Sequence, residues 1–310
     1  MDAFLTTAQQ VAIMLILIML GFLLAKIKIF NDDGVKSMTN MVLYFVTPCV
    51  IIKSFIREFD VNTLKDIGLS FAGALGAHII YIITAHLIIR DKTYSRKCVL
   101  QYSIVFANCG YMALPLLEAI LGNDGVLYAT SFIAIFNLIA WSYGIVLISG
   151  DKKYMSPKKM LINPGMIAIA IGFVLFFCSV SQEKIPAVIY KPIEHLSFLN
   201  TPLPMTIIGY HLSKADFKKI FTDIWALLSI AIRLIVMPAV VLGVLYLCGM
   251  RGTMLIASVV CAAAPVAANT TMFASKYNQD TELSVNMVSL STVISVVTIP
   301  VIVALTQLVA

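Results

Sequence analysis

The sequence predicts an all-α integral membrane protein with about ten transmembrane helices. Of its 310 residues, 60% are hydrophobic and only 12% are charged, whereas ordinary soluble domains are about 45–50% hydrophobic and about 25% charged. Windows without Asp, Glu, Lys or Arg recur at 3–25, 67–89, 98–117, 125–150, 160–182, 252–275 and 283–310. Each is close to the roughly 20 residues that cross a hydrocarbon core about 30 Å thick. A water-soluble globular fold is therefore excluded.

We expect the ten spans at 8–25, 35–56, 63–89, 96–118, 124–149, 163–181, 187–211, 222–248, 252–274 and 281–308. The first basic residue is Lys26, so the N-terminal apolar run lacks the basic region of a signal peptide and is expected to remain as the first span. No segment is long or polar enough to fold as a separate soluble domain.

The distribution of basic residues predicts the orientation. With the N-terminus outside, the cytoplasmic loops carry 15 Lys and Arg and the opposite loops carry six. Because cytoplasmic loops are enriched in Lys and Arg, both termini are expected outside a cell membrane. The net charge of +6 is spread over short clusters beside apolar runs, so it indicates orientation in the bilayer and not a nucleic-acid partner.

A faint internal repeat relates the two halves of the chain. Gly21-Phe22 matches Gly172-Phe173, Thr47-Pro48 matches Thr201-Pro202, and Pro115 matches Pro265, at offsets of 150 to 154 residues. We therefore divide the chain into a first repeat at 1–150, a cytoplasmic loop at 151–162 and a second repeat at 163–310. Each half holds five spans, an odd number, so the halves must enter the membrane from opposite sides, which is a transporter architecture. Pro48 and Pro202 are expected to act as structural hinges that bend the supporting helices.

Spans four and nine carry helix-breaking residues near their centres. Span four contains Asn108, Gly110 and Pro115, and span nine contains Pro265 and Asn269. We expect both helices to break and to cross near the midplane, because broken helices in lipid mark binding sites. The helix dipoles that meet there roughly cancel, so they favour neither anions nor cations. The two Asn side chains either contact a substrate or only cap frayed helix ends.

The run from Asn108 to Gly122, NCGYMALPLLEAILG, resembles the fourth-span signature of the auxin efflux carrier family. Four other segments resemble the same family: Asn163-Pro164, Pro202 with Ile208-Gly209, Arg233 with Pro238, and Ala264-Pro265 followed by Phe273-Ala274-Ser275-Lys276-Tyr277. The resemblance covers nearly the whole chain. It implies a fold like that of the bile-acid/sodium symporters, with helices four and nine broken at a crossover, and an elevator type of alternating access.

The loop at 150–162 is short, which resembles the compact bacterial members of that family and departs from its long-loop plant members. The bacterial members are usually described as malate or malonate permeases, and the plant members carry indole-3-acetate. The resemblance thus implies a small organic anion as the substrate, with Cys109 beside Asn108 in the binding region. It also suggests a homodimer.

Three further residues inside spans are candidates. Asn137 lines the cavity or packs against a broken helix. Glu118 binds a coupling proton or sodium ion, or it lies solvated near the outer surface. Arg233 pairs with a substrate carboxylate, extends toward the cytoplasm, or stabilises the fold through backbone carbonyls.

Other functions receive less support from the residues. Cys49, Cys98, Cys109, Cys178, Cys248 and Cys261 are scattered and show no metal-ligand spacing. No nucleotide-binding motif and no recognisable catalytic motif occurs, so we expect no cofactor, no metal and no enzymatic activity. A sodium-coupled symporter resembling bile-acid carriers is the alternative, followed by a membrane receptor without transport.

Overall fold

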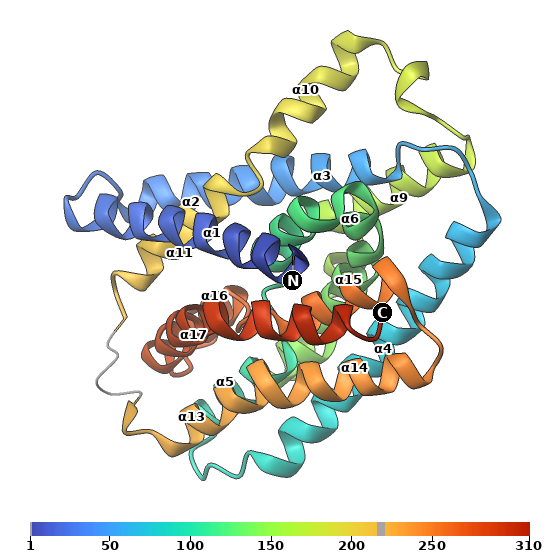
Figure 1. Ribbon diagram of the computed structural model, residues 1–310. Coiled ribbons are helices and arrows are strands. Elements are labelled where there is room, and N and C mark those ends of the chain that lie inside the picture. The colour runs from blue at the N-terminus through green and yellow to red at the C-terminus, as the bar shows by residue number, and fades with distance from the viewer. Residues whose placement is uncertain (1, 216–220) are drawn as a thin grey trace.

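The computed structural model describes residues 2–215 and 221–310, which form a bundle of helices (Figure 1). The helices of the first half are α1 Asp2–Lys26, α2 Asp32–Met41, η1 Val42–Val46, α3 Thr47–Phe55, α4 Val61–Ile88, α5 Tyr94–Val105, η2 Cys109–Ala113, α6 Leu114–Ile139, η3 Ala140–Gly144 and α7 Ile145–Ser149. Those of the second half are η4 Lys152–Tyr154, α8 Pro157–Leu161, α9 Pro164–Phe177, η5 Gln182–Lys184, α10 Ala187–Phe198, α11 Pro202–Leu212, α13 Ile224–Ala231, η6 Ile232–Val236, α14 Met237–Leu247, α15 Gly252–Ala263, α16 Asn269–Lys276 and α17 Thr281–Gln307.

Six helical segments in the described ranges are long and apolar enough to cross a membrane: Leu5–Lys26, Asp32–Phe55, Val61–Ile88, Cys109–Ser149, Ile224–Leu247 and Thr281–Gln307. The helices α9 and α15 are also apolar but shorter. Large aliphatic side chains such as Ile16, Val174 and Val297 are more than 60% exposed. An exposed apolar surface on apolar helices is characteristic of a membrane protein, because lipid tails and not water contact it. The all-helical membrane class is thus confirmed.

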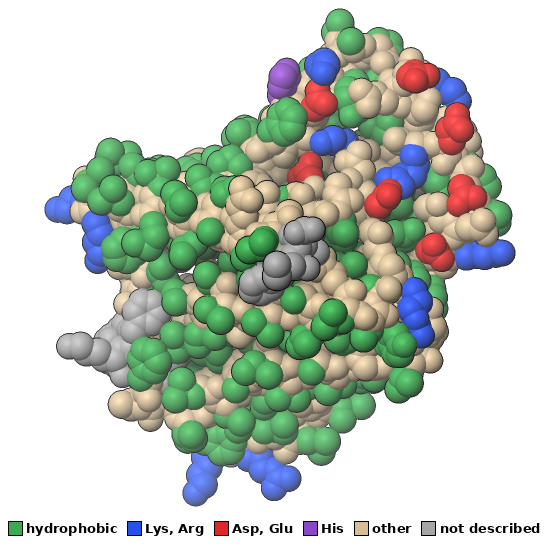
Figure 2. Space-filling model, in the orientation of Figure 1, with side chains coloured by type: hydrophobic (Ala, Val, Ile, Leu, Met, Phe, Trp, Pro, Cys, Tyr) green, Lys and Arg blue, Asp and Glu red, His purple; other side chains and the backbone are tan. Residues whose placement is uncertain are grey.

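Charged side chains gather at the upper right of the molecule and at its left and lower edges (Figure 2). In this view, Asp and Glu side chains lie at the upper end, over α10 and the neighbouring connections, together with Lys and Arg. The left and lower edges show Lys and Arg without Asp or Glu, and hydrophobic side chains cover most of the surface between these edges and the upper right. This separation is the one expected for a bilayer across the middle of the molecule.

The segment Cys109–Ser149 is too long for one crossing. Its 41 residues would extend about 60 Å as a single straight helix, twice the thickness of a hydrocarbon core. Within it, Gly122 adopts φ +62° and ψ −150°, a left-handed conformation that interrupts α6. A residue without a Cβ tolerates that conformation. Gly122 thus divides α6 into two parts. The first belongs to the expected fourth span, and the second begins the expected fifth span.

The expected span at 187–211 is not one helix, which corrects the sequence prediction. It is divided into α10 and α11 by a turn at 199–201. Pro202 takes the first helical position of α11, where its missing N–H is not needed. The expected hinge at Pro202 is therefore a complete break between two helices, and α10 projects from the body of the bundle (Figure 1).

Three π-helical segments each end two residues before a proline. The segments η1, η2 and η6 precede Pro48, Pro115 and Pro238, which lie in the first turn of α3, α6 and α14. A proline inside a helix cannot donate to the carbonyl four residues earlier, and its ring clashes with that carbonyl. The wider π register removes the clash, so Pro48 changes the helical register without ending the span.

The centre of the protein is formed by α15, in which every residue from Met254 to Ala263 is buried. The helix packs between α6 and α17 and also contacts α4 and α14. It ends at Ala263, Ala264 is extended, and the chain becomes helical again at Asn269. The core of the fold thus surrounds a broken helix.

Two helix pairs cross in unusually close contact, and a glycine lies at each crossing. A Cβ atom on Gly209 of α11 would lie 2.0 Å from the carbonyl oxygen of Ile18, and one on Gly21 of α1 would lie 2.2 Å from that of Thr206. In the other pair, a Cβ on Gly172 of α9 would lie 2.5 Å from the ring of Phe55 in α3. The pairs α1–α11 and α3–α9 therefore require glycine, because any side chain would force the helices apart.

We predict that Gly209→Ala lowers the thermal stability of the purified protein in detergent. Its methyl group would meet backbone atoms of Ile18 and Phe22, and forced overpacking costs about 1–3 kcal/mol. The matched control is Gly243→Ala in α14, where the added Cβ has no neighbour within 4 Å and helix propensity favours alanine. Equal melting temperatures for the two variants would contradict the close crossing of α1 and α11.

Candidate functional site

The site is built where two helices break and pair with each other. The helix α5 ends at Val105 and α15 ends at Ala263, and each chain then becomes extended. Ala107 and Val266 form an antiparallel β-bridge. We call this region, residues 106–108 and 264–268, the crossing. Non-helical backbone at membrane depth is stable only when protein groups satisfy its polar atoms.

Two backbone hydrogen bonds join the two strands of the crossing. The amide of Asn108 donates to the carbonyl of Pro265 at 2.7 Å, and the amide of Ala267 donates to the carbonyl of Phe106 at 3.0 Å. Beyond the crossing the chain becomes helical again, as η2 at Cys109 and as α16 at Asn269. The crossing therefore brings two helix C-termini and two helix N-termini together.

Pro115 and Pro265 do not hold equivalent positions, which corrects their assignment as repeat partners. Pro265 lies within the crossing, where it offers its carbonyl, whereas Pro115 lies in the first turn of α6. The bridge instead aligns Ala107 with Val266, an offset of 159 residues (266 minus 107). One shared proline at an offset of 150 residues does not establish which residues of the two broken spans correspond.

Polar groups without partners surround the starts of the second helices. Asn108 is 5% exposed, and its Nδ2 donor has no hydrogen-bond partner among the described residues. The same is true of Asn269 Oδ1 and of the hydroxyl of Thr270, which is fully buried. Neither η2 nor α16 has a side-chain cap at its N-terminus. Buried donors and acceptors left open in this way are available to a ligand.

Arg233 contacts the C-termini of both broken helices. Its side chain is fully buried, and its Nη1 donates to the carbonyl of Ile104 in α5 at 2.9 Å. Its Nη2 donates to the carbonyl of Ala262 in α15. The guanidinium also lies over the ring of Tyr81, 4.8 Å from the ring centroid. Of the roles considered from the sequence, the structure shows the contact with backbone carbonyls.

The carbonyls of Ile104 and Ala262 need another hydrogen-bond donor, because the amides that would bond them in a continuous helix form other hydrogen bonds at the crossing. In a continuous helix, the amide four residues later would donate to each of them. The amide of Asn108 donates to Pro265, and the amide of Val266 donates to the hydroxyl of Ser291 at 3.1 Å. Arg233 replaces both missing donors with one side chain.

The other predicted site residues occupy different surroundings. Cys109 is buried at the start of η2, and a Cβ on Gly110 would have no neighbour within 4 Å. The Nδ2 of Asn137 donates to the carbonyl of Ile133 in its own helix at 3.0 Å. Glu118 forms an ion pair with Lys53 of α3 at 3.4 Å, and its side chain is 21% exposed.

Sequence reasoning missed Lys53, Ser291 and Tyr81. Lys53 gave a weak signal as a single basic residue near the end of an apolar run, and Ser291 lies in the polar sequence Ser-Leu-Ser-Thr of the last span. Their importance depends on partners at least 25 residues away in sequence. No local pattern contains that information.

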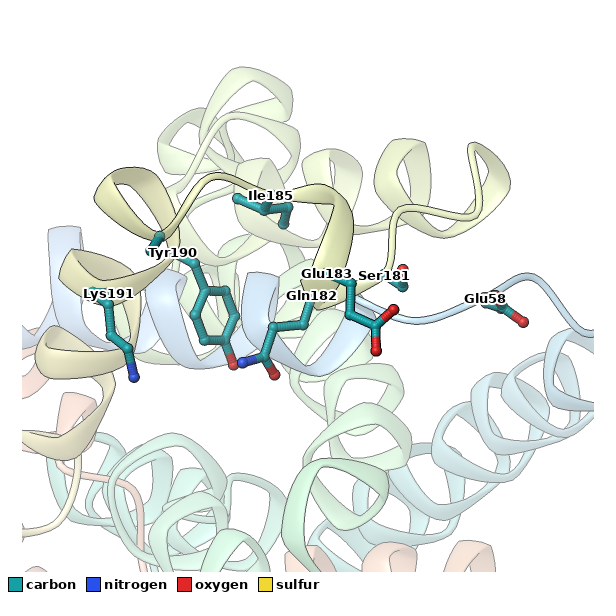
Figure 3. A pocket seen from close by; sticks show the side chains of 8 residues that line it. Glu58, Ser181, Gln182, Glu183, Ile185, Tyr190 and Lys191 are labelled. Atoms are coloured by element: carbon teal, nitrogen blue, oxygen red, sulfur yellow. The ribbon is translucent and has the colours of Figure 1, made fainter.

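A separate groove of about 610 Å³ lies away from the crossing, between the α3–α4 connection, η5 and α10 (Figure 3). Tyr190 and Gln182 point toward the same space in it, with Glu58, Glu183 and Lys191 around them. None of the predicted site residues lines it.

The sequence matches a protein family over most of its length. Residues 6–303 match the family described as membrane transport protein, which is the auxin efflux carrier family. The chain belongs to this family. The resemblance noted from the Asn108–Gly122 run is thus confirmed, and the family is one of membrane transporters.

Two archaeal proteins are similar to this family member over nearly their whole length. An uncharacterized transporter of Methanothermobacter thermautotrophicus is 24% identical over 304 residues, covering 96% of this chain and 97% of the relative. The uncharacterized transporter MJ1031 of Methanocaldococcus jannaschii is 23% identical over 309 residues, covering 93% and 95%.

We predict that Ser291→Ala destabilises this carrier family member by about 1–3 kcal/mol, the usual cost of leaving a buried amide unsatisfied. The variant removes the acceptor of the Val266 amide in the crossing. The control is Ser295→Ala in the same helix, whose buried hydroxyl donates to the carbonyl of Thr292 within α17 and lies 3.8 Å from the sulfur of Met112, but bonds no backbone group of the crossing. Thermal unfolding of both variants in detergent measures the difference, and a larger loss in Ser295→Ala would contradict this account of the crossing.

Proposed function

We propose that the protein is a secondary transporter that carries a small organic anion, such as a mono- or dicarboxylate or an auxin-like acid, across the cell membrane. The observation that carries the proposal is the crossing, where two broken helices pair and leave buried polar groups without partners. Membership in a family of membrane transporters supports transport over catalysis or signalling.

The close helix contacts support ten crossings of the membrane in two inverted repeats, at 1–150 and 163–310. In the proposed repeat, Gly21 of α1 corresponds to Gly172 of α9. Both glycines allow their helix to contact a helix of the opposite half, α11 and α3 respectively. The same contact thus occurs twice, once from each half, as a two-fold relation between repeats requires.

The proposed substrate site is the crossing and the helix starts beside it. In this proposal the side chains of Asn108 and Asn269, whose amide groups each have an atom without a partner among the described residues, bind the charged group of the substrate together with Cys109 and the backbone amide of Gly110. Pro115, Pro265, Arg233 and Asn137 support these groups from the adjoining segments. Helix N-termini favour negative charge, which fits an anion.

The packing also supports an elevator type of alternating access. The helices α1, α3, α9 and α11 contact one another in the two glycine-containing pairs, and we call these four helices the frame. The helices α4, α6, α15 and α17 pack around the crossing. Pro48 and Pro202 lie at the starts of α3 and α11, within the frame. Displacement of the second group against the frame would expose the crossing to each side in turn.

The Lys53–Glu118 ion pair links the frame to the helix that follows the fourth-span break. This position makes Glu118 the residue through which a proton or sodium ion would couple to the movement. In the alternative of a sodium-coupled symporter, the crossing itself would bind the ion through neutral oxygens, because no Asp or Glu side chain in the described ranges is buried.

We predict that proteoliposomes containing the protein show counterflow of at least one acid from a panel of malate, malonate, lactate and indole-3-acetate. In Asn108→Ala, uptake should fall at least tenfold, because about 1.4 kcal/mol of lost binding corresponds to that factor. The comparison variant is Asn123→Ala, an exposed residue of α6 outside the crossing, which should leave uptake unchanged. Uptake that survives in Asn108→Ala would move the site away from the crossing, and no uptake of any acid by folded protein would refute the anion assignment.

We predict that a cysteine at position 110 reacts with an impermeant maleimide from both sides of the membrane. The variant is Gly110→Cys in a chain whose six native cysteines are replaced, and a Cβ there has no neighbour within 4 Å. The control retains Cys178 alone, which is exposed at the end of α9 and should react only from outside if the N-terminus is outside. Labelling of Gly110→Cys from one side under every condition would contradict alternating access.

A further inference from the structure

Four helix ends meet at the crossing, two with a partial negative charge and two with a partial positive charge. Each helix C-terminus carries about −0.5 of an elementary charge and each N-terminus about +0.5. The ends of α5 and α15 are C-termini, and the starts of η2 and α16 are N-termini. Taken alone, the two kinds of end would sum to roughly zero.

The guanidinium of Arg233 lies at the two C-termini and bonds a carbonyl of each. Its full positive charge offsets the total of about −1 at those ends, which leaves about +1 from the two N-termini. The two N-termini have no comparable partner among the described residues. No side chain caps η2 or α16, and the Nδ2 of Asn108 is buried without a hydrogen-bond partner.

Among the residues whose burial the structure describes, no buried carboxylate can cancel the remaining charge. Arg233 is the one Arg, Lys, Asp or Glu side chain that is buried in the described part of the chain. The titratable groups that interact with it are Tyr81 and His78 of α4 and Cys109 of η2, none of which is a carboxylic acid. A charge at such depth in a membrane protein is costly unless it serves a function.

We propose that Arg233 makes the crossing selective for anions by neutralising the C-termini of α5 and α15, without itself contacting the substrate. It is thus a positioning residue that sets the charge of the site. The ligand chemistry this favours is one compact negatively charged group, such as a single carboxylate, bound by the amides at the start of η2. The inference rests on the proposed function only in placing the substrate at the crossing.

The test measures the potential at the crossing with charged thiol reagents, so it needs no knowledge of the substrate. The protein carries Gly110→Cys as its one cysteine, and the probes are an anionic sulfonatoethyl and a cationic trimethylammonioethyl methanethiosulfonate. The ratio of their reaction rates is divided by the same ratio measured on a protein that retains Cys178 alone. This control has an exposed thiol remote from the crossing.

We expect the anionic reagent to be favoured when Arg233 is present and the normalised ratio to fall at least tenfold in Arg233→Gln. One charge about 10 Å away, at an effective dielectric constant of about 20, changes the local concentration of an ion by roughly that factor. Arg233→Lys keeps the charge and should keep the ratio at neutral pH or below. An unchanged ratio in folded Arg233→Gln, or the same fall in Arg233→Lys at low pH, would overturn the proposal.

The Lys variant also provides the test if Arg233→Gln does not fold. A buried lysine loses its proton at a lower pH than a solvated one, whereas arginine stays charged. The normalised ratio should therefore fall as the pH is raised in Arg233→Lys and stay constant in the parent protein. A ratio that does not change with pH in the variant would overturn the proposal.

Transport measurements separate this proposal from the proposed function. If acids are carried but the thiol ratios do not depend on Arg233, only the role of Arg233 fails. If the ratios change as expected but no acid is carried, the crossing is an anion-selective site and the assigned substrate class fails.

Discussion

The structure depends on one constraint: two helices are broken inside a membrane, and the backbone groups that the breaks expose must find partners within the protein. An unsatisfied amide or carbonyl in hydrocarbon costs several kcal/mol. The two breaks satisfy part of this need by pairing with each other through Asn108–Pro265 and Phe106–Ala267. Ser291 and Arg233 satisfy the amide and the two carbonyls that remain beside the pair. The geometry of the site therefore follows from the need to satisfy backbone hydrogen bonds and does not depend on a ligand.

This constraint also explains which helices surround the crossing. Arg233 comes from η6, and Ser291 comes from α17, so both helices must lie against the breaks. The π register of η6 has a local cause in Pro238, which follows it by two residues. A guanidinium at this depth is tolerated because its hydrogen bonds and the ring of Tyr81 replace water. The broken helices thus require Arg233, and the buried charge of Arg233 in turn requires the carbonyls and the ring of Tyr81.

The frame has a simpler physical basis. The helix pairs α1–α11 and α3–α9 cross at glycines: the backbones of α1 and α11 contact directly, and the ring of Phe55 in α3 packs on Gly172 of α9, so both contacts are close and rigid. The crossing is less completely bonded than the frame, because several of its polar side-chain atoms have no hydrogen-bond partner in the described part of the chain. A rigid frame beside a bundle with an incompletely satisfied centre is the arrangement that the proposed movement requires. Lys53 and Glu118 join the two parts through an ion pair with little solvent exposure.

The sequence by itself determined the membrane class, the approximate positions of the apolar helices and the family. These follow from composition, from the spacing of charges and from the run around Asn108, all of which are local properties. It also indicated that spans four and nine carry helix breakers, since the effects of proline and glycine on a helix are local too.

Only the tertiary structure decided how the helices meet. The sequence matched Pro115 with Pro265 as equivalent positions of the two repeats, and it treated 187–211 as one helix. The structure pairs Ala107 with Val266 and divides that segment at 199–201. It also shows which groups Arg233 bonds, two backbone carbonyls that lie 129 and 29 residues away in sequence. Hydrogen bonds over such separations depend on three-dimensional packing, and the packing of apolar helices is not encoded in any short pattern of residues.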